Sequence, residues 1–256
     1  MNENTILTSA TSRKERIISF FWQHFLLLIS LFVMTFGVSL CVRSNLGSSV
    51  ISSLPLALSL AGDEGAAPRL SLGMYTNVLN VLLVTTQIII FGRRFPLIQL
   101  LQLAVSVVFG ALIDLNMALT ATIDCTTLPM QTLVQVLGCT VMGFGIAMEV
   151  RCGSVTMAGE GVPVAINKVY GIPFAKAKIG VDISLVVLAV TACFIFFGSW
   201  LWNVVGVGTL FAMFYVGFTV KLFGSHIGWF EHLLHYRPGF RRYLYGLARY
   251  LPHNRM

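Results

Sequence analysis

Charged residues are scarce in this sequence. Asp, Glu, Lys and Arg make up 11% of the 256 residues, whereas apolar residues make up 56%, and the mean hydropathy is +0.82. Soluble domains carry about a quarter charged residues. The composition therefore excludes an ordinary soluble globular protein and indicates a polytopic membrane protein.

Enzyme motifs are also lacking. The sequence contains no HExxH, GxSxG, P-loop or dinucleotide-binding pattern. We therefore expect no enzymatic activity, no cofactor and no ATP-driven transport within this chain. The five cysteines include no CxxC pair, so we expect small buried side chains in preference to disulfides or a metal site.

Long apolar runs dominate what the sequence does contain. A helix needs about 20 predominantly apolar residues to cross a bilayer. Six charge-poor runs have that length: 18–42, 70–92, 96–119, 127–149, 179–199 and 204–224. The sequence therefore predicts an all-α fold, a polytopic membrane protein with six transmembrane helices.

Lys and Arg are distributed unevenly around these runs. If the N-terminus is inside, only Arg43 and Arg69 of the 17 basic residues fall outside, and cytoplasmic loops are the ones enriched in basic residues. We therefore expect both termini to be cytoplasmic, with residues 1–16 as an N-terminal tail. Residues 225–256 are expected to form a basic amphipathic tail on anionic lipids. The net charge of +7 then reflects topology and requires no nucleic-acid partner.

A stretch that leaves the first apolar run returns 108 residues later. Residues 37–60 (GVSLCVRSNLGSSVISSLPLALSL) align without gaps with residues 145–168 (GIAMEVRCGSVTMAGEGVPVAINK). Arg43 matches Arg151, and Pro55 matches Pro163; both residue types are scarce in apolar segments. We interpret the match as an internal repeat.

The repeat and the topology together predict an inverted arrangement. The membrane domain, 17–224, divides into repeat one, about 17–120, and repeat two, about 125–224, with three runs in each. The second repeat then enters the membrane from the opposite side. This 3+3 inverted-topology repeat is a common plan in transporters.

The connections after the first and fourth runs are long and are expected to contain a short helix each. Residues 50–61 are uncharged and too short to cross a bilayer, which favours a re-entrant or interfacial half-helix. Proline suits the first turn of a helix, Ser or Gly the cap before it, and Gly the stop. The expected prolines, caps and stops are Pro55, Ser53 and Gly62 in the first half and Pro163, Gly161 and Gly171 in the second.

Two motifs resemble those of the YczE/YitT-like integral membrane proteins. They are residues 37–47 (GVSLCVRSNLG) and residues 176–187 (KAKIGVDISLVV), and the likeness covers most of residues 20–225. The sequence departs at residues 47–53 (GSSVISS), where the family's first re-entrant segment often reads GxxPWD. The resemblance implies a six-span protein of the bacterial inner membrane, and it supplies no settled activity.

Several polar residues are candidates for a substrate site between the two half-helices. Glu160 lies in a glycine-flanked segment before the second half-helix; it is either a functional carboxylate at membrane depth or an ordinary loop residue. Arg43 and Arg151 either snorkel to the interface or form a symmetric anion site with the half-helix N-termini. The serines and threonine beside these segments complete the candidates: Ser48, Ser49 and Thr156.

Three further polar residues are candidates for coupling or for lining a cavity. Asp182 is either a proton or cation site or the partner of Lys178 in an i,i+4 surface pair. Asn77 and Asn80 share one face of the second run, where they either join helices or line a cavity.

These features predict a secondary transporter or facilitator of a small, anionic or zwitterionic solute, with a proton or cation as a coupling ion. The alternative is a membrane scaffold or regulatory subunit that acts through protein partners. An intramembrane enzyme is disfavoured by the lack of a catalytic constellation. The sequence does not determine the oligomeric state, and a homo-oligomer is one of the alternatives.

Overall fold

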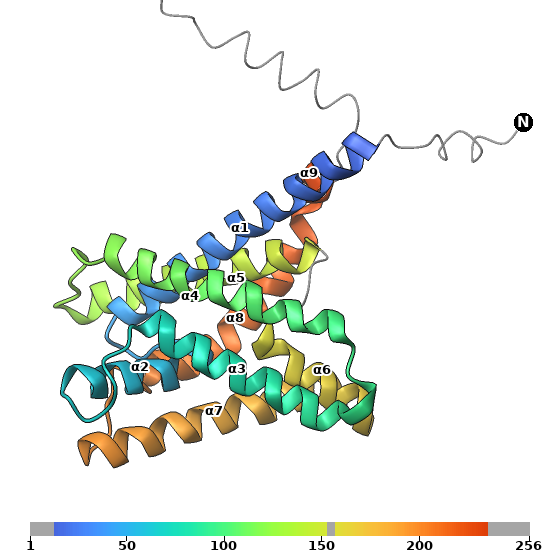
Figure 1. The fold of residues 1–256 in the computed structure, drawn as a ribbon. Coiled ribbons are helices and arrows are strands. Elements are labelled where there is room, and N and C mark those ends of the chain that lie inside the picture. The colour runs from blue at the N-terminus through green and yellow to red at the C-terminus, as the bar shows by residue number, and fades with distance from the viewer. Residues whose placement is uncertain (1–12, 153–156, 235–256) are drawn as a thin grey trace, which may run out of the picture.

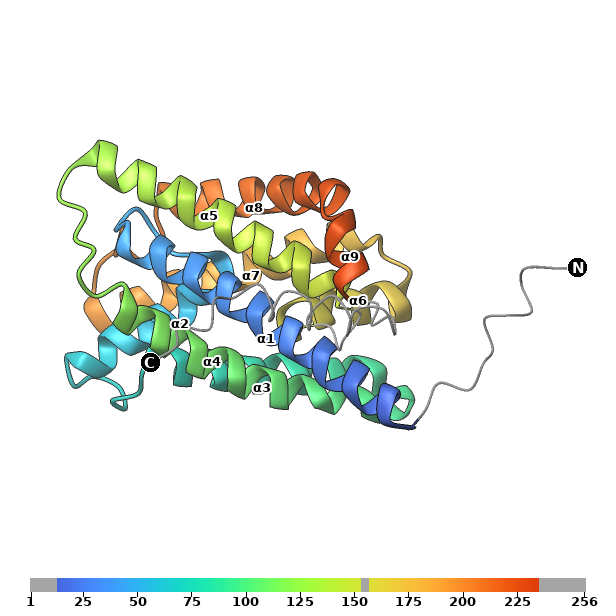
Figure 2. The same ribbon diagram turned by 90° about the horizontal axis from the view of Figure 1, so that it is seen from above.

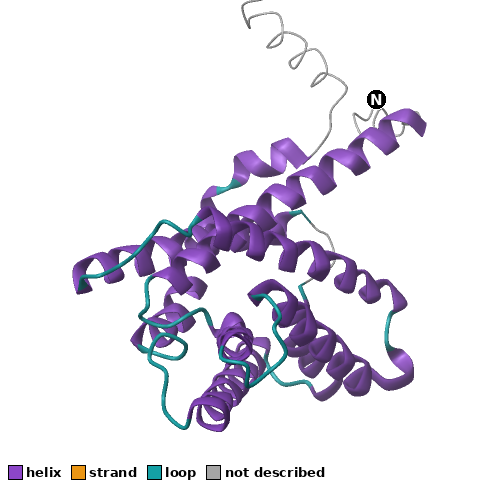
Figure 3. Cartoon of the chain, turned by 60° about the vertical axis from the view of Figure 1, so that its left-hand side comes forward, coloured by secondary structure: helices purple, strands orange, loops and turns teal. Residues whose placement is uncertain are grey.

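A computed structural model describes residues 13–152 and 157–234, and within these ranges every regular element is a helix (Figure 3). The α-helices are α1 (Arg13–Arg43), α2 (Val50–Asp63), α3 (Leu72–Phe91), α4 (Leu101–Leu119), α5 (Leu128–Arg151), α6 (Ala158–Tyr170), α7 (Phe174–Phe197), α8 (Val207–His226) and α9 (Gly228–Leu234). Two short 3-10 helices, Gly92–Arg94 and Leu97–Leu100, connect α3 to α4. The all-α expectation is confirmed for the described residues.

The six expected membrane spans are confirmed by length and composition. Helices α1, α3, α4, α5, α7 and α8 are each long and apolar enough to cross a bilayer. Three helix starts differ from the expectation by five residues. Helix α4 begins later than expected, at Leu101, because the 3-10 helix Leu97–Leu100 precedes it; the other two begin earlier. Helix α1 begins at Arg13, so residues 13–16 are part of the helix, and α7 begins at Phe174. In both cases the helix continues past the apolar run into its basic flank, because Lys and Arg are good helix formers.

Helices α1 and α5 form the main packing pair of the bundle. Helix α1 also packs against α4, and α5 packs against α8. Helix α3 packs against α4 and α6, while α2 packs against α7 (Figure 1). The short helices α2 and α6 lie towards opposite ends of the bundle (Figure 2).

Glycines allow α1 and α5 to approach closely. A Cβ on Gly37 would lie 2.4 Å from the backbone nitrogen of Met142, and a Cβ on Gly145 would lie 2.5 Å from that of Met34. A Cβ on Gly138 would lie 2.9 Å from the backbone nitrogen of Cys41. Small residues are typical of such crossings in membranes, where packing replaces the hydrophobic effect as the driving force.

The short helices begin about one turn earlier than the sequence predicts. Helix α2 starts at Val50 and α6 at Ala158, so Pro55 and Pro163 lie inside the helices. The expected caps, Ser53 and Gly161, are helical too. Each proline removes one backbone donor to the carbonyl four residues before it, but the buried surroundings hold the preceding turn helical. The expected stop at Gly171 is confirmed, because this glycine has a left-handed conformation with φ 70°.

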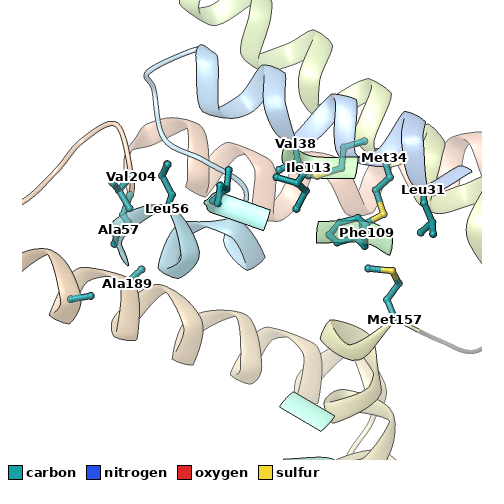
Figure 4. Packing of buried hydrophobic residues seen from close by; sticks show 14 of the residues in the cluster. Leu31, Met34, Val38, Leu56, Ala57, Phe109, Ile113, Met157, Ala189 and Val204 are labelled. Carbon is teal, nitrogen blue, oxygen red and sulfur yellow. The ribbon is translucent and has the colours of Figure 1, made fainter. Parts of the chain in front are cut away.

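Buried apolar side chains join the long helices to the start of α6. Phe109 and Ile113 of α4 lie beside Met34 and Val38 of α1, and Met157 lies opposite Phe109 (Figure 4). A second part of the same cluster joins α2 to α7 and to the segment before α8 through Leu56, Ala57, Ala189 and Val204. This core holds both short helices inside the bundle.

The segment after α8 departs from the expected lipid-bound tail at its start. Phe230 of α9 is 1% exposed and Ile227 is 2% exposed, and both pack in a cluster with Leu26 of α1. The indole nitrogen of Trp22 donates a hydrogen bond to the carbonyl of Leu233 at 2.8 Å. This start of the tail therefore docks on α1 and α5, and the expected tail residues 235–256 lie outside the described residues.

Candidate functional site

The N-terminal ends of α2 and α6 meet inside the bundle. A Cβ on Gly159 would lie 2.2 Å from Cδ1 of Ile51, so the two first turns are in direct contact. Val50, Ala158 and Val162 share one buried cluster with residues of α3 and α7. We call this contact between the first turns of α2 and α6 the junction.

Serines surround the start of α2. Ser48, Ser49, Ser52 and Ser53 are all buried. The hydroxyls of Ser49 and Ser52 lie 2.6 Å apart, and that of Ser53 donates to the carbonyl of Val50 at 2.7 Å. The N-cap residue Ser49 makes no side-chain cap. The first amides of α2 therefore lack a capping side chain, and the helix dipole gives this end a partial positive charge.

Helix α3 places amide side chains on its buried face. Asn80 is fully buried, and neither its Nδ2 nor its Oδ1 has a hydrogen-bond partner among the described residues. An unsatisfied buried polar group costs about 1–3 kcal/mol. In the part of the chain that the structure describes, the Oδ1 of Asn77 also lacks a partner, and this side chain lies against Gly110 of α4.

A pair of glutamines connects the same face of α3 to α6. Gln87 and Gln102 are buried and exchange hydrogen bonds of 3.1 and 3.3 Å. The Nε2 of Gln87 also donates to the carbonyl of Ala158 at 3.3 Å. Asn80 lies two turns before Gln87 on this face, because residues at i, i+4, i+7 and i+8 share one side of a helix. Asn80 therefore belongs to the α3 face that meets the junction.

Two carboxylates, one in α6 and one in α7, interact with each other and with a lysine of α7. Glu160 is in the first turn of α6, and the Nζ of Lys178 contacts Oδ1 of Asp182 at 2.6 Å within α7. Burial raises the pKa of the Glu160 carboxyl, Lys178 lowers it and Asp182 raises it; the net direction is upwards. Asp182 thus makes the expected i,i+4 pair and also acts on Glu160.

The two arginines bind the carbonyl ends of long helices. Arg43 donates from Nη2 to the carbonyl of Met117 in the last turn of α4, at 2.9 Å. Arg151 donates to the carbonyls of Gly224 and Ile227 at the end of α8. C-terminal carbonyls carry partial negative charge and accept hydrogen bonds from cations. The symmetric anion site of the two arginines stays a prediction.

Of the expected site residues, Ser48, Ser49 and Glu160 lie in or next to the first turns of α2 and α6, and Asp182 interacts with Glu160. Asn80 lies on the face of α3 that carries Gln87, whose side chain reaches the start of α6. Thr156 lies outside the described residues.

Sequence reasoning overlooked Gln87, Gln102 and, most importantly, Glu149. Glu149 is the single carboxylate within α5 and is 5% exposed. It interacts electrostatically with Glu160. A carboxylate within a span is a signal for a functional site by itself, and that signal is present in the sequence.

Comparisons with known proteins give one match. Residues 21–225 match the model of a family of unknown function, DUF6198. No curated protein and no solved structure matches the chain. The resemblance to YczE/YitT-like proteins and the bacterial origin that it implies therefore stay predictions.

Proposed function

The chain belongs to the DUF6198 family of unknown function, and from the geometry of its junction we propose that it is a secondary transporter or facilitator. Its solute is small and anionic or zwitterionic, and a proton or cation is the coupling ion. The junction carries the proposal, because it brings two helix N-termini together inside a membrane bundle. Helix α3, which packs against both short helices, carries a buried amide, Asn80, that has no partner among the described residues. Broken or short helices that meet in this way hold the substrate in many transporters.

An inverted repeat is the first support for this proposal. A shift of 108 residues relates Arg43 to Arg151, the ends of α1 and α5, and Val50 to Ala158, the starts of α2 and α6. The packing pairs follow the same relation, since α1 with α4 corresponds to α5 with α8, and α2 with α7 corresponds to α6 with α3.

Individual contacts obey the same relation. Gly37 contacts Met142, and Gly145 contacts Met34; the shift of 108 residues exchanges these two contacts. Arg43 binds the end of α4, and its equivalent binds the end of α8. We infer that the two halves are related by a pseudo-twofold axis through the α1–α5 crossing.

The two halves also differ. Helix α3 packs extensively against α4, whereas the equivalent helices α7 and α8 have at most slight contact. In alternating access, one repeat or bundle moves against the other around a fixed site. Such motion requires pairs of helices that can separate, and α7 and α8 are the pair that meets this requirement here.

The solute class follows from the charges at the junction. The N-terminal ends of α2 and α6 favour negative charge, while Glu160 in the first turn of α6 favours a positive group. A zwitterion satisfies both preferences, and a small anion satisfies the α2 end. Asn80 supplies an amide NH2 group and an amide oxygen that have no partner within the described ranges.

The apolar packing of the junction favours a second candidate function. Ile51 lies against Gly159, and Val50, Val162 and Leu185 share one buried cluster. A dry junction of this kind suits a membrane scaffold or regulatory subunit without solute flux. The second candidate predicts protein partners in place of a solute.

Solute binding is the property that separates the two candidates. The protein, purified in detergent, is tested by thermal shift against organic anions, amino acids, inorganic anions and cations. A ligand at about 100 times its dissociation constant stabilises a protein by about 2.7 kcal/mol. We expect a hit that is lost in Asn80→Leu and in Glu160→Gln, followed by flux of the same solute in proteoliposomes.

Asn116→Leu is the matched control for these variants. Asn116 is also a fully buried amide with an unpartnered Oδ1, but its Nδ2 donates to Thr35 of α1, away from the junction. The hit should survive this change. The absence of any hit in well-folded protein would instead support the scaffold.

We place the protein in the bacterial inner membrane, with both termini cytoplasmic. The uneven distribution of Lys and Arg supports this orientation. Helices α5, α6 and α7 then bring Glu149, Glu160 and Lys178, respectively, to the cytoplasmic half of the bundle.

A further inference from the structure

Polar side chains line the contact between α3 and α4 along most of its length. At one end, the hydroxyl of Ser71 donates to Oδ2 of Asp114 at 2.6 Å, and the backbone nitrogen of Gly73 donates to Oδ1 at 2.8 Å. At the other end, Gln87 and Gln102 exchange hydrogen bonds of 3.1 and 3.3 Å. Gly73 and Gln87 are about 21 Å apart along α3, since a helix rises 1.5 Å per residue. We call the contact between these two ends the α3–α4 seam.

Two asparagines lie between the ends of the seam. A Cβ on Gly110 of α4 would lie 2.5 Å from both Nδ2 and Oδ1 of Asn77, so Asn77 faces α4. Asn80 follows Gly73 by seven residues and precedes Gln87 by seven, and residues at i and i+7 share one side of a helix. Because both of these neighbours contact α4, Asn80 faces α4 too.

Ser106 of α4 lies at the level of Asn80. It is 3% exposed, and it is four residues from both Gln102 and Gly110, so it is on the side of α4 that faces α3. The two helices are antiparallel, with Gln87 opposite Gln102 and Asn77 against Gly110. Asn80 lies between the two contacts on α3, and Ser106 lies between them on α4. Three polar side chains, Asn77, Asn80 and Ser106, therefore occupy the middle of the seam.

The amide of Asn80 has unused hydrogen-bonding capacity. A carboxamide offers two donors and an acceptor oxygen. Asn80 is fully buried, yet neither its Nδ2 nor its Oδ1 has a partner in the part of the chain that the structure describes. Unpaired buried polar groups destabilise a fold, and ordered water is a common partner for such groups. The middle of the seam therefore has the chemistry of a ligand site.

The seam suits a neutral ligand. Helix α3 has no charged side chain between Ser71 and Gln87, and α4 has none between Gln102 and Asp114. An ion in the middle of the seam would therefore lack a balancing charge, which is costly in a buried site. The amide requires a ligand that accepts from its nitrogen and donates to its oxygen. Water meets both requirements.

We propose that the α3–α4 seam binds one or more water molecules at Asn80, inside the membrane-spanning part of the bundle. The bound water accepts from Nδ2 of Asn80 and donates to its Oδ1. Oδ1 of Asn77 and the hydroxyl of Ser106 are the further partners that the seam offers. Buried waters typically make about three hydrogen bonds, and these groups are enough to supply them.

The water site distinguishes the α3–α4 seam from the other helix contacts. The α1–α5 crossing is closed by glycines, which bring backbone against backbone. In the second half, α7 and α8 have at most slight contact, so they form no comparable seam. The hydrated contact is therefore a property of the first half of the chain.

The seam ends at the first turn of α6. Nε2 of Gln87 donates to the carbonyl of Ala158 at 3.3 Å, and a Cβ on Gly161 would lie 2.4 Å from Oε1 of Gln87. Water in the seam is thus separated from the start of α6 by the glutamine pair alone. A role of this water as a partner for the polar groups of a solute rests on the proposed function, whereas the water site itself does not.

Nuclear magnetic resonance of the side-chain amides tests the water site directly. The full-length protein is purified in detergent without added solute, with isotope-labelled nitrogen in asparagine alone. The signals of Asn80 are those that disappear in Asn80→Leu; Asn80→Ser gives the same assignment where the first variant does not fold. We expect magnetisation transfer from water to the Nδ2 protons of Asn80.

Two other asparagines are the controls in the same spectrum. Asn116 is fully buried, and its Nδ2 donates to Oγ1 of Thr35 at 2.7 Å and to the carbonyl of Phe32 at 3.2 Å, so it should show no transfer from water. Asn167 is exposed and should show transfer. Absence of transfer to Asn80, with Asn167 positive, would overturn the proposal.

Thermal stability gives an independent test without solute. Asn80→Leu keeps a similar side-chain volume and removes the amide. If the amide is dry and unpaired, this change relieves an unfavourable burial and the melting temperature rises. If water is bound, the change leaves Asn77 and Ser106 with fewer partners, so we expect the melting temperature to fall. A melting temperature equal to or above that of the wild type would contradict a water site.

The outcomes separate the water site from transport. A solute hit without transfer from water to Asn80 would overturn the water site and leave transport intact. Transfer from water without any solute hit would support the water site and leave the scaffold as the function.

Discussion

Arg43 and Arg151 join distant parts of the chain through backbone carbonyls. Each lies at the end of one long helix and binds the last turn of another, α4 for Arg43 and α8 for Arg151. The last carbonyls of a helix have no donor within the helix. Each arginine therefore donates hydrogen bonds to carbonyls that have no donor within their own helix, and its positive charge offsets the partial negative charge of that helix end.

Removal of either arginine should lower stability. Hydrogen bonds to charged groups contribute about 1.5–3 kcal/mol, so Arg43→Ala and Arg151→Ala should each lower the free energy of unfolding in detergent by about that amount. Arg69→Ala, at an exposed position between α2 and α3, is the control and should have little effect. An effect of the two variants equal to that of the control would contradict a structural role.

At the residue scale, the sequence predicts which residues are equivalent in the two halves better than it predicts the groups to which their side chains bind. The pairing of Arg43 with Arg151 follows from the repeat, but the carbonyls that bind them belong to residues more than 70 positions away. A backbone carbonyl has no signature in the sequence, so these contacts could not be predicted. Glu149 is different, because a carboxylate among apolar residues was visible from the start.

The crossing of α1 and α5 depends on the absence of side chains. Gly37 faces the backbone of Met142, and Gly145 faces the backbone of Met34. Backbone atoms cannot move aside as a flexible side chain can. A larger residue at either glycine must therefore push the two helices apart.

Substitution of these glycines should be costly. Overpacking costs about 1–3 kcal/mol, so Gly37→Leu and Gly145→Leu should each lower the free energy of unfolding by at least that amount. Gly180→Leu in α7 is the matched control, because nothing lies within 4 Å of its Cβ position. Leu is a better helix former than Gly, so the control should be neutral or slightly stabilising. A loss of stability in the control as large as that of the other two would show that the crossing is not the cause.

At the element scale, the six spans could be predicted because bilayer thickness sets their length. The residues at which α2 and α6 begin could not be predicted. Local rules place Pro55 and Pro163 in the first turn, but both helices begin five residues earlier. Contact between Ile51 and Gly159 buries the first turns, and this tertiary contact is absent from any local rule.

In the whole molecule, the buried serines Ser48, Ser49, Ser52 and Ser53 belong to the α2 side of the junction, and Glu160 belongs to the α6 side. Helix α2 lies towards one end of the bundle and α6 towards the other (Figure 2). If the halves are inverted in the membrane, the loops that follow α2 and α6 must open to opposite sides.

Labelling of single positions tests this arrangement. Glu64 follows α2 and Lys176 begins α7, and both are exposed. We expect a membrane-impermeant maleimide to label Glu64→Cys in intact cells and to label Lys176→Cys only after permeabilisation. The wild type is the control, since its five cysteines are buried or half-buried. Labelling of both variants from the same side would contradict the inverted topology.

At the scale of the molecule, the all-helical bundle could be predicted from composition, and the packing order could not. The sequence repeat relates equivalent segments but does not say which helices touch. The contact of α2 with α7 and of α3 with α6 comes from the three-dimensional arrangement of the two halves. The first turns of α2 and α6 come into contact only in that arrangement.

The α1–α5 pair has a consequence for biosynthesis. Helix α1 enters the bilayer before the ribosome has made its main partner. The hydroxyls of Ser30, Thr35 and Ser39 donate to carbonyls of their own helix. Their hydrogen-bonding groups are therefore satisfied within α1, and this face of the helix can contact lipid before its protein partners are present. Asn116 of α4 then docks on Thr35 at 2.7 Å. We therefore expect the nascent chain to insert one helix at a time and to reach its final packing only when α5 has packed against α1.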